Sequence, residues 1–224
     1  NNGDDTWTLV DDTLAILYPG VYDVAVTATD LADNSATDSS TEELTVDKSA
    51  PALLSFTRTN PAGNTTNADS LLFTATFDNI VSKVDTTDFT ATGTTANITE
   101  VTPSTGSSYQ ITVSGGNLAD LDGTVGLNLA SEQDIVDLAG NLLPDSEPAV
   151  DETYTVINSG PSLLGFIRQH PSDALTNADG LTFRAMFTSA VESVDTTDFA
   201  VTGTTASVAE VHPITTEIYD IVVN

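Results

Sequence analysis

The chain has 224 residues, of which 33 are acidic, 5 are basic and none is cysteine, and its formal net charge is -28 at pH 7. This charge argues against nucleic acid and anionic membranes as partners, and the lack of cysteine excludes disulfide bonds and thiolate metal sites. Hydrophobic residues make up 39% of the chain, which is enough for packed cores. No apolar run is long enough to predict insertion into a membrane.

The first predicted piece, residues 1–48, resembles the second half of a β-domain. Polar and apolar residues alternate along it, which predicts strands at 6–10, 21–29 and 42–47. The loop TDLADN at 29–34 lies between the last two of these strands. We therefore expect this piece to supply the last strands of a domain and to lack the first ones.

The second piece, residues 49–158, is predicted to be one complete domain. Apolar and polar residues alternate with a period of two, and turn sequences such as PSTGS and GGNLADLDG separate the runs. The segment VDTTDF predicts one short helical turn, capped by Asp85 or Thr86. Strands are expected near residues 52–58, 70–77, 89–92, 96–102, 108–114, 123–130 and 151–157. Such a series of short antiparallel strands predicts an all-β, immunoglobulin-like (Ig-like) sandwich with aromatic residues between its sheets.

The third piece, residues 159–224, repeats the second. Residues 161–224 match residues 51–114 without a gap, always 110 positions apart, with 33 identities in 64 pairs. This repeat predicts tandem Ig-like domains in an extended array, in which the third piece supplies the first five strands of a domain and lacks the last two. The linkers at 46–51 and 156–161 are short and each ends in proline, so we expect semi-rigid connections.

These motifs resemble those of a known group of repeat proteins. GVYDVAVTATDLADNSA followed by LTVDKSAP is similar to the tandem bacterial Ig-like repeats of giant calcium-dependent, RTX-type surface adhesins. TNADSLLFTATF, VDTTDF and GTVGLNLASEQDIVDLAGNLL resemble a second type of Ig-like repeat in the same proteins. The resemblance implies a secreted protein of the Gram-negative cell surface, whose repeats hold an adhesive tip away from the cell. It also implies that calcium stiffens the junctions between neighbouring domains.

Acidic loops at the two ends of the predicted sandwich are the candidate calcium sites. Calcium takes about six to eight oxygen ligands, and no EF-hand spacing occurs, so any site must combine several loops. At the proximal end, next to the first linker, the candidates are Asp47, Asp78, Asp85, Asp88, Asp134 and Asp137. At the distal end, next to the second linker, they are Asn67, Asp69, Asp120 and Asp122, together with Asp195 and Asp198 of the third piece. Asp30 and Asp179 are candidates as the counterparts of Asp137 and Asp69.

Each candidate has a second interpretation. Asp30 and Asp137 either bind calcium or hold their own turns through backbone hydrogen bonds. Asp85 and Asp88 either bind calcium or cap the short helical turn. The acidic excess as a whole either keeps the chain soluble, including in salty water where charges are screened, or is partly neutralised by divalent cations in the folded state.

The sequence predicts no catalytic site. His170 and His212 are isolated, their counterparts in the repeat are Asn60 and Thr102, and no glycine-rich phosphate loop occurs. We therefore expect a non-catalytic, extracellular extender segment of a cell-surface adhesin. The alternatives are a module that itself binds polysaccharide or a host surface, and an accessory domain of a large secreted enzyme. The two half-domains are either parts of a longer array or complete one another head to tail between chains, which would build a fibre.

Overall fold

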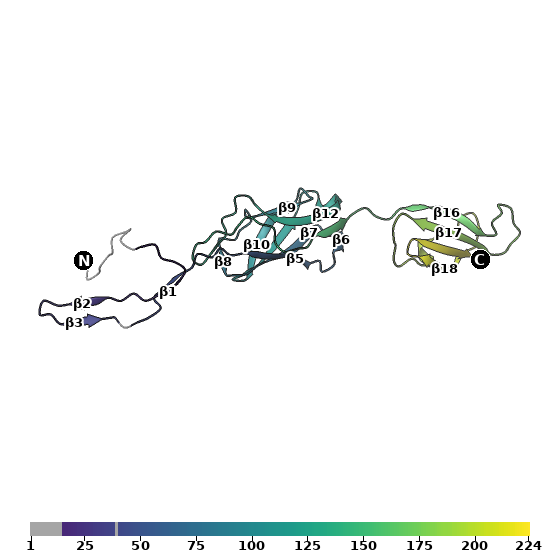
Figure 1. Ribbon diagram of the computed structural model, residues 1–224. Coiled ribbons are helices and arrows are strands. Elements are labelled where there is room, and N and C mark those ends of the chain that lie inside the picture. Colours follow the sequence, from purple (N-terminus) through teal and green to yellow (C-terminus); the bar gives the residue numbers. More distant parts are fainter. Residues whose placement is uncertain (1–14, 39) are drawn as a thin grey trace. The chain divides into compact units, whose positions relative to one another are not determined.

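The computed structural model describes residues 15–38 and 40–224 (Figure 1). The described residues form β-strands and two 3-10 turns, and they contain no helix long and apolar enough to cross a membrane. The chain divides by contacts into two compact units, residues 1–158 and 159–224. The predicted strand at 6–10 lies outside the described residues, and the predicted boundary between residues 48 and 49 stays a prediction.

Residues 49–158, which we call the complete domain, form a sandwich of two sheets. The first sheet has the order β10-β11-β7-β5-β14. Its strands are β5 (Leu53–Asn60), β7 (Ser70–Phe77), β10 (Asn97–Thr105), β11 (Ser108–Ser114) and β14 (Val150–Asp151). Neighbouring strands are antiparallel, except that β14 runs parallel to β5.

The second sheet has the order β6-β15-β12-β9, in which β6 runs parallel to β15. Its strands are β6 (Thr65–Thr66), β9 (Phe89–Thr92), β12 (Asp122–Leu129) and β15 (Tyr154–Ile157). A small ladder joins β8 (Val81–Ser82) to β13 (Val136–Asp137), and a 3-10 turn, η1 (Leu118–Asp120), precedes β12. If the main strands are lettered A to G in chain order, the sheets read D-E-B-A and G-F-C, which is the strand order of an immunoglobulin sandwich. The predicted fold class is therefore confirmed.

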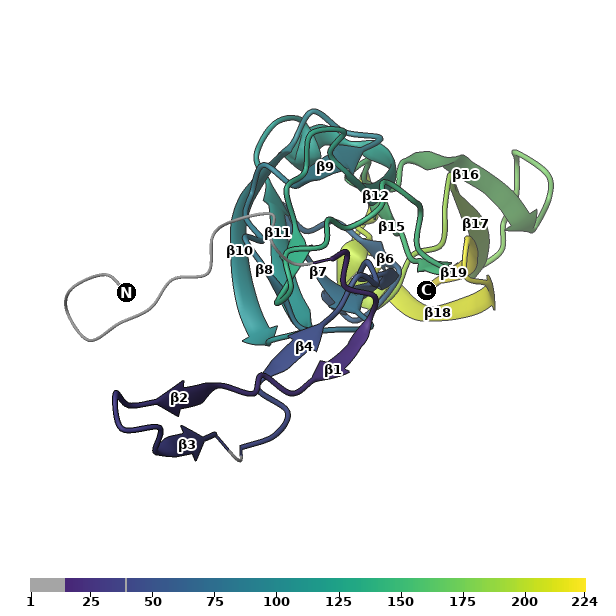
Figure 2. The ribbon, with the colours of Figure 1, turned by 60° about the vertical axis from the view of Figure 1, so that its left-hand side comes forward.

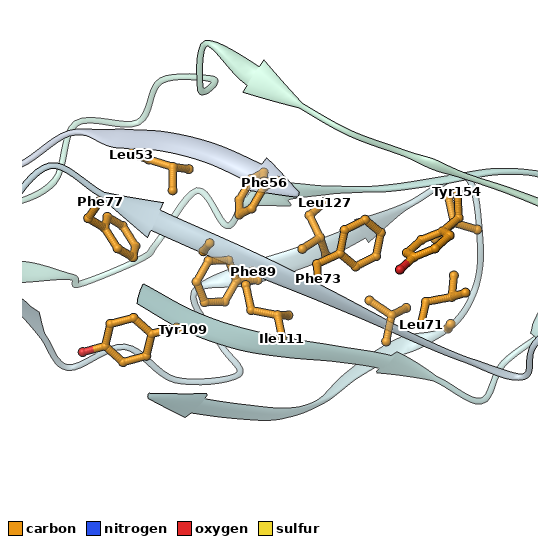
Figure 3. Packing of buried hydrophobic residues seen from close by; sticks show 14 of the residues in the cluster. Leu53, Phe56, Leu71, Phe73, Phe77, Phe89, Tyr109, Ile111, Leu127 and Tyr154 are labelled. Carbon is orange, nitrogen blue, oxygen red and sulfur yellow. The ribbon is translucent and has the colours of Figure 1, made fainter. Parts of the chain in front are cut away.

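Alternating side chains from both sheets meet in one core (Figure 3). Phe56 of β5 packs edge-on against Phe89 of β9, with ring centroids 6.1 Å apart, and Phe73 of β7 packs edge-on against Tyr154 of β15 at 5.0 Å. The hydroxyl of Tyr154 donates to the carbonyl of Pro61 at 2.9 Å, so this buried ring also satisfies its polar atom. These pairs cross from one sheet to the other, and the core therefore needs both sheets.

All seven strands predicted for the complete domain occur, with their ends shifted by a few residues. The main correction concerns the last one, predicted at 151–157. It is split into β14, which joins the first sheet, and β15, which joins the second. The predicted helical turn at VDTTDF is a plain turn in this domain, and its second copy forms the 3-10 turn η2 (Thr196–Asp198) with Asp195 as the cap.

The described part of the N-terminal piece forms two short ladders that follow one another along a hairpin (Figure 2). In the first, β1 (Gly20–Tyr22) pairs with β4 (Leu44–Val46), and in the second, β2 (Thr27–Thr29) pairs with β3 (Ser35–Thr37). The strand predicted at 21–29 is thus divided between β1 and β2. The pairing with β3 was not predicted, because its sequence, SAT, lacks large apolar residues.

Residues 159–224, which we call unit 2, contain a single four-stranded sheet of order β16-β17-β19-β18. Its strands are β16 (Leu163–His170), β17 (Leu181–Phe187), β18 (Val208–Thr215) and β19 (Ile218–Val223). By the 110-residue repeat they correspond to β5, β7, β10 and β11, so unit 2 has the A-B-E-D sheet. Of the five strands predicted here, the third, at 199–202, does not form, because its counterpart β9 pairs only with β12, which has no equivalent in unit 2.

Candidate calcium sites at the domain ends

The loops predicted to meet at the proximal end of the complete domain do meet. The pairing of β8 with β13 joins the loop after β7 to the loop after β12. The backbone NH of Val81 donates to the carbonyl of Gly106 at 3.0 Å, which brings in the turn between β10 and β11. The side chain of Asn141 donates to the carbonyl of Asp47 at 3.3 Å and ties the first linker to the same end.

Asp137 and Asp30 each hold their own turn. One carboxylate oxygen of Asp137 accepts the backbone NH groups two and four residues later, at 2.8 and 2.9 Å, and the other accepts the side-chain amide of Asn141 at 2.9 Å. Asp30 makes the same three bonds, ending with Asn34, at 2.8, 2.9 and 2.8 Å. The hydrogen bonds from Asn141 and Asn34 keep the pKa of both carboxyl groups below the usual value. These contacts are the ones expected of the turn interpretation.

Asp88 is the buried carboxylate of the proximal end, with 1% of its surface exposed. Its two oxygens accept the backbone NH groups of Asp85 at 2.7 Å and Asp134 at 3.2 Å, so it links the start of β9 to the loop after β12. Burial raises the pKa of Asp88 above its usual value. Asp85 accepts the backbone NH and the hydroxyl of Thr87, at 2.7 and 2.6 Å, which supports the capping interpretation.

The other three proximal candidates have separate local partners. Asp47 accepts the backbone NH two residues later at 2.9 Å, and Asp78 accepts the backbone NH of Ala52 at 2.8 Å. Asp134 forms an ion pair with Lys83 at 3.1 Å, with both side chains more than half exposed. An exposed pair of this kind contributes little to stability. All three carboxylates are exposed or half-buried at the surface, where a cation can reach them.

At the distal end of the complete domain, the contacts come from Asn158. Its backbone NH donates to Asp122 at 2.7 Å, and its side chain donates to the carbonyls of Leu118 at 2.6 Å and Leu121 at 3.1 Å. The beginning of the second linker is therefore held against η1. The remaining distal candidates in this domain are exposed on their loops: Asn67, Asp69 and Asp120.

The candidates of unit 2 lie on its own loops. Asp195 accepts the backbone NH and the hydroxyl of Thr197, at 2.7 and 2.6 Å, and Asp198 accepts the backbone NH of Asp195 at 2.8 Å. Together these bonds form a capping box. Asp198 is exposed although its counterpart Asp88 is buried, and Asp179 is also exposed.

Within residues 15–38 and 40–224, no three histidine, aspartate or glutamate side chains are gathered into a group that would hold a metal ion. At the proximal end, Asp88 links Asp85 and Asp134, because its carboxylate accepts the backbone NH groups of both residues. A calcium ion would therefore require backbone carbonyls, water or movement of the loops to reach about six oxygen ligands. Calcium binding at these residues stays a prediction.

Two asparagines organise the domain ends: Asn141, which was not predicted from the sequence, and Asn158, which was considered only as a contributor to a calcium site at the second linker. Asn141 had a visible signal, because DLAGN and DLADN place an asparagine four residues after the aspartate in both segments. The contact of Asn158 with η1 had no signal in the sequence, because its partners are carbonyl groups of Leu118 and Leu121, about 40 residues earlier in the chain. Both residues connect a linker to the complete domain.

Comparison with known proteins gives little further information. No protein-family model and no curated protein matches the chain. Among solved structures, the chain is similar to the Escherichia coli adhesin FdeC, with 12% sequence identity, 92% of this chain and 78% of that chain covered, and a TM-score of 0.38. Similarity at this level adds nothing to the fold assignment, which rests on strand order and register.

Proposed function

We propose that this chain is a non-catalytic extender segment of a secreted cell-surface adhesin. The observation that carries this proposal is that both linkers are tied into the complete domain, through Asn141 at the proximal end and Asn158 at the distal end. Only residues 159–161 separate Asn158 from Ser162, whose backbone NH donates to the hydroxyl of Thr188 within unit 2. Short, anchored linkers of this kind limit how far successive domains can move independently.

The path of the chain through the complete domain also supports the proposal. The chain enters at the start of β5 and leaves at the end of β15, after β14 has run parallel to β5. Entrance and exit are therefore at opposite ends of the sandwich, about 27 Å apart for a strand of eight residues. A domain that advances the chain by the length of its strands suits a role in spanning distance.

We further propose that calcium binds among the proximal acidic residues and stiffens this junction. A formal charge of -28 makes the compact chain repel itself, so a bound divalent cation adds stability. We expect the melting temperature to be higher in calcium than in chelator. We also expect calcium to increase the maximum dimension of the chain measured by small-angle scattering. Magnesium at the same ionic strength is the control for charge screening. Melts that coincide in calcium and in chelator would refute calcium binding and leave the extender role standing.

Two variants separate a bound ion from general screening. Asp47→Asn removes a linker candidate, and Asp145→Asn removes one exposed charge from the loop after β12 without touching a candidate. The proposal expects the calcium-induced rise in melting temperature to shrink in the first variant and to persist in the second. A glycan array tests the main alternative, because reproducible binding of one glycan by this chain would identify a binding module in place of an extender.

A further inference from the structure

The two sides of the unit 2 sheet have diverged unequally from the complete domain. One side corresponds to the core side of the first sheet of the complete domain, and its residues are the same in both copies. Phe183, Ala185, Tyr219 and Ile221 stand where the complete domain has Phe73, Ala75, Tyr109 and Ile111. On the other side, nearly every residue differs. Because the strand order is kept, this difference concerns the surroundings of that side and not the fold.

Two neighbouring rows of residues run across the side that differs. The first row consists of Ile167, Arg184, Asp220 and His212, at positions held in the complete domain by Thr57, Thr74, Gln110 and Thr102. The second row consists of Gly165, Met186, Ile218 and Thr215, at positions held by Ser55, Thr76, Ser108 and Thr105. We call these two rows the outer face of unit 2. Hydroxyl and amide groups are thus replaced by apolar side chains around a pair of opposite charges.

The exposure of the outer face does not depend on the second sheet of a sandwich. In the complete domain, that sheet lies on the core side, and β14 joins the edge of the first sheet. Thr57, Thr74 and Gln110 stay partly exposed there. Ile167, at the position of Thr57, is 46% exposed. An apolar group at such a position is unfavourable in water and favours a partner that covers it.

An ion pair lies at the centre of the outer face. Arg184 donates from Nε to one oxygen of Asp220 at 2.8 Å and from a terminal nitrogen to the other oxygen at 3.0 Å. The side chains of Arg184 and Asp220 are 28% and 19% exposed. Both charges have a partner within the chain, so a second surface can cover them without leaving a charge unpaired. The pair gives the face a positive position on β17 and a negative position on β19.

We propose that the outer face of unit 2 binds the outer face of a second copy of the chain. A two-fold axis that runs along the strands, between β17 and β19, places β17 of each copy over β19 of the other. Arg184 then lies over Asp220 of the second copy, and Met186 lies over Ile218. The four charged groups alternate in sign, and the apolar side chains of the second row meet. Two sheets aligned in this way pack about 10 Å apart, as in a sandwich.

A second copy is the occupant that this pattern fits, because the outer face is complementary to itself. The chain has 33 acidic residues and 5 basic ones, so repulsion opposes contact between copies over most of the surface. Arg184 is one of those five basic residues, and on this face it stands beside the type of residue that it would meet in the second copy. The two-fold arrangement therefore gives each arginine an acidic partner on both chains, which fixes the register of the contact.

The area of the outer face limits the strength of the contact. Four strands about 4.8 Å apart and about seven residues long cover roughly 450 Å² on each chain. A total of about 900 Å² is typical of weak, transient contacts. Because each face meets the same face of its partner, association ends at two chains. Both units then run in the same direction, as neighbours on one cell surface would, although the contact does not require the extender role.

Sedimentation equilibrium of the 224-residue chain tests the proposal, at concentrations from about 10 µM to about 1 mM, which weak contacts require. The expected result is a mass that rises from the 23.3 kDa of one chain toward twice that value and then stops. A mass that stays at one chain up to about 1 mM would overturn the proposal, whether another part of the same chain covers the face or nothing does. A mass that rises beyond two chains would overturn the two-fold arrangement.

The complete domain supplies the substitutions that test the outer face. Ile167→Thr combined with Met186→Thr gives two positions of the face the residues of the complete domain. Threonine favours strands, so the double variant should keep its fold. Its association should weaken by about tenfold or more, because apolar surface is lost from the contact. Association as strong as that of the original chain would contradict the proposal.

Two single variants are the matched controls. Leu163→Thr removes a 45% exposed leucine from the other side of the same sheet. Leu175→Thr removes a 93% exposed leucine outside the sheet, where the complete domain has Thr65. Both variants should associate like the original chain. Loss of association in Leu163→Thr, with association kept in the double variant, would assign the contact to the other side of the sheet.

An exchange of charges tests the register. Arg184→Asp and Asp220→Arg each place like charges across the axis, so each variant alone should remain a single chain. Mixed together, the two variants should form a dimer with one chain of each kind, because the aspartates of one face meet the arginines of the other. Hydrogen exchange of β17 and β19 checks that both variants are folded. A mixture of folded variants that stays single would refute the pairing of Arg184 with Asp220.

Discussion

Phe56 and Phe166 are the same residue in the two copies of the repeat, and they should respond very differently to Phe→Ala substitution. Phe56 is fully buried and packs edge-on against Phe89 at 6.1 Å. Phe166 makes the same edge-on contact with Phe199 at 6.0 Å, but 51% of its surface is exposed. The aromatic contact is therefore matched, and the difference lies in the second sheet that covers Phe56.

The expected magnitudes follow from burial. Phe56→Ala leaves a cavity between two sheets and should lower the free energy of unfolding of the complete domain by about 3–5 kcal/mol. Phe166→Ala removes about half of a buried phenylalanine from a site open to water and should cost unit 2 about 1 kcal/mol, without a cavity term. The difference of about 2–4 kcal/mol corresponds to about 30-fold to 700-fold in the unfolding equilibrium.

Hydrogen exchange of the intact chain measures both effects. Peptides from β7 and β11 report on the complete domain, and peptides from β17 and β19 report on unit 2. Phe56→Leu is a milder companion in case Phe56→Ala unfolds the domain, with an expected cost of about 1.5 kcal/mol or less. Equal costs for the two alanine variants would show that the second sheet does not determine the energetics.

Three further experiments test separate features. Gly93→Ala should unfold or strongly destabilise the complete domain, because its methyl group would overlap the carbonyl oxygen of Thr124 on β12. Gly203→Ala should cost unit 2 only the strain of a positive φ, about 1–2 kcal/mol, because its methyl group would meet nothing within 4 Å. Equal effects of the two substitutions on hydrogen exchange would contradict a role for the β12 contact. The pKa of Asp137 is lower in the folded chain than the usual value of 3.8, so its ionised carboxylate stabilises the fold above that value and this stabilisation is lost as the pH falls toward the folded-state value. Asp137→Asn should therefore make the melting temperature fall less steeply when the pH is lowered through this range. Arg184 donates to both oxygens of Asp220 at 2.8 and 3.0 Å, so a double-mutant cycle should give a favourable coupling in unit 2 that weakens with added salt, and a salt-independent coupling would argue against an ionic origin.

The sandwich itself is predictable from the sequence because period-two alternation is regular in strands such as β7 and β11. The run LLFTATF places Leu71, Phe73 and Phe77 on one side, and all three are buried. The splitting of the last strand into β14 and β15 is not visible in this pattern, because a switch of sheets leaves the alternation unchanged. The register of the small parallel ladders depends in the same way on the tertiary fold.

Residues 199–202 show the limit of reasoning from a repeat. Their sequence, FAVT, corresponds to FTAT at 89–92, which forms β9 in the first copy, yet they form no strand in unit 2. Strand formation at these positions depends on hydrogen bonds with β12, and a local sequence pattern does not show whether that partner strand is present. The candidate calcium residues illustrate a related limit, because an aspartate that holds a turn, such as Asp137, has the same local sequence whether or not it also binds a cation.

Unit 2 corresponds to residues 51–114 of the complete domain, so it also shows the structure that these residues can form before residues 115–158 have been synthesised. A chain synthesised from its N-terminus presents strands A to E of this domain first, and at that stage Phe56 would be as exposed as Phe166 is in unit 2. The apolar side of the sheet formed by strands A, B, D and E would stay uncovered until the F strand, β12 (Asp122–Leu129), emerges. A formal net charge of -28 gives repulsion between chains, which opposes contact between two such uncovered surfaces during this interval.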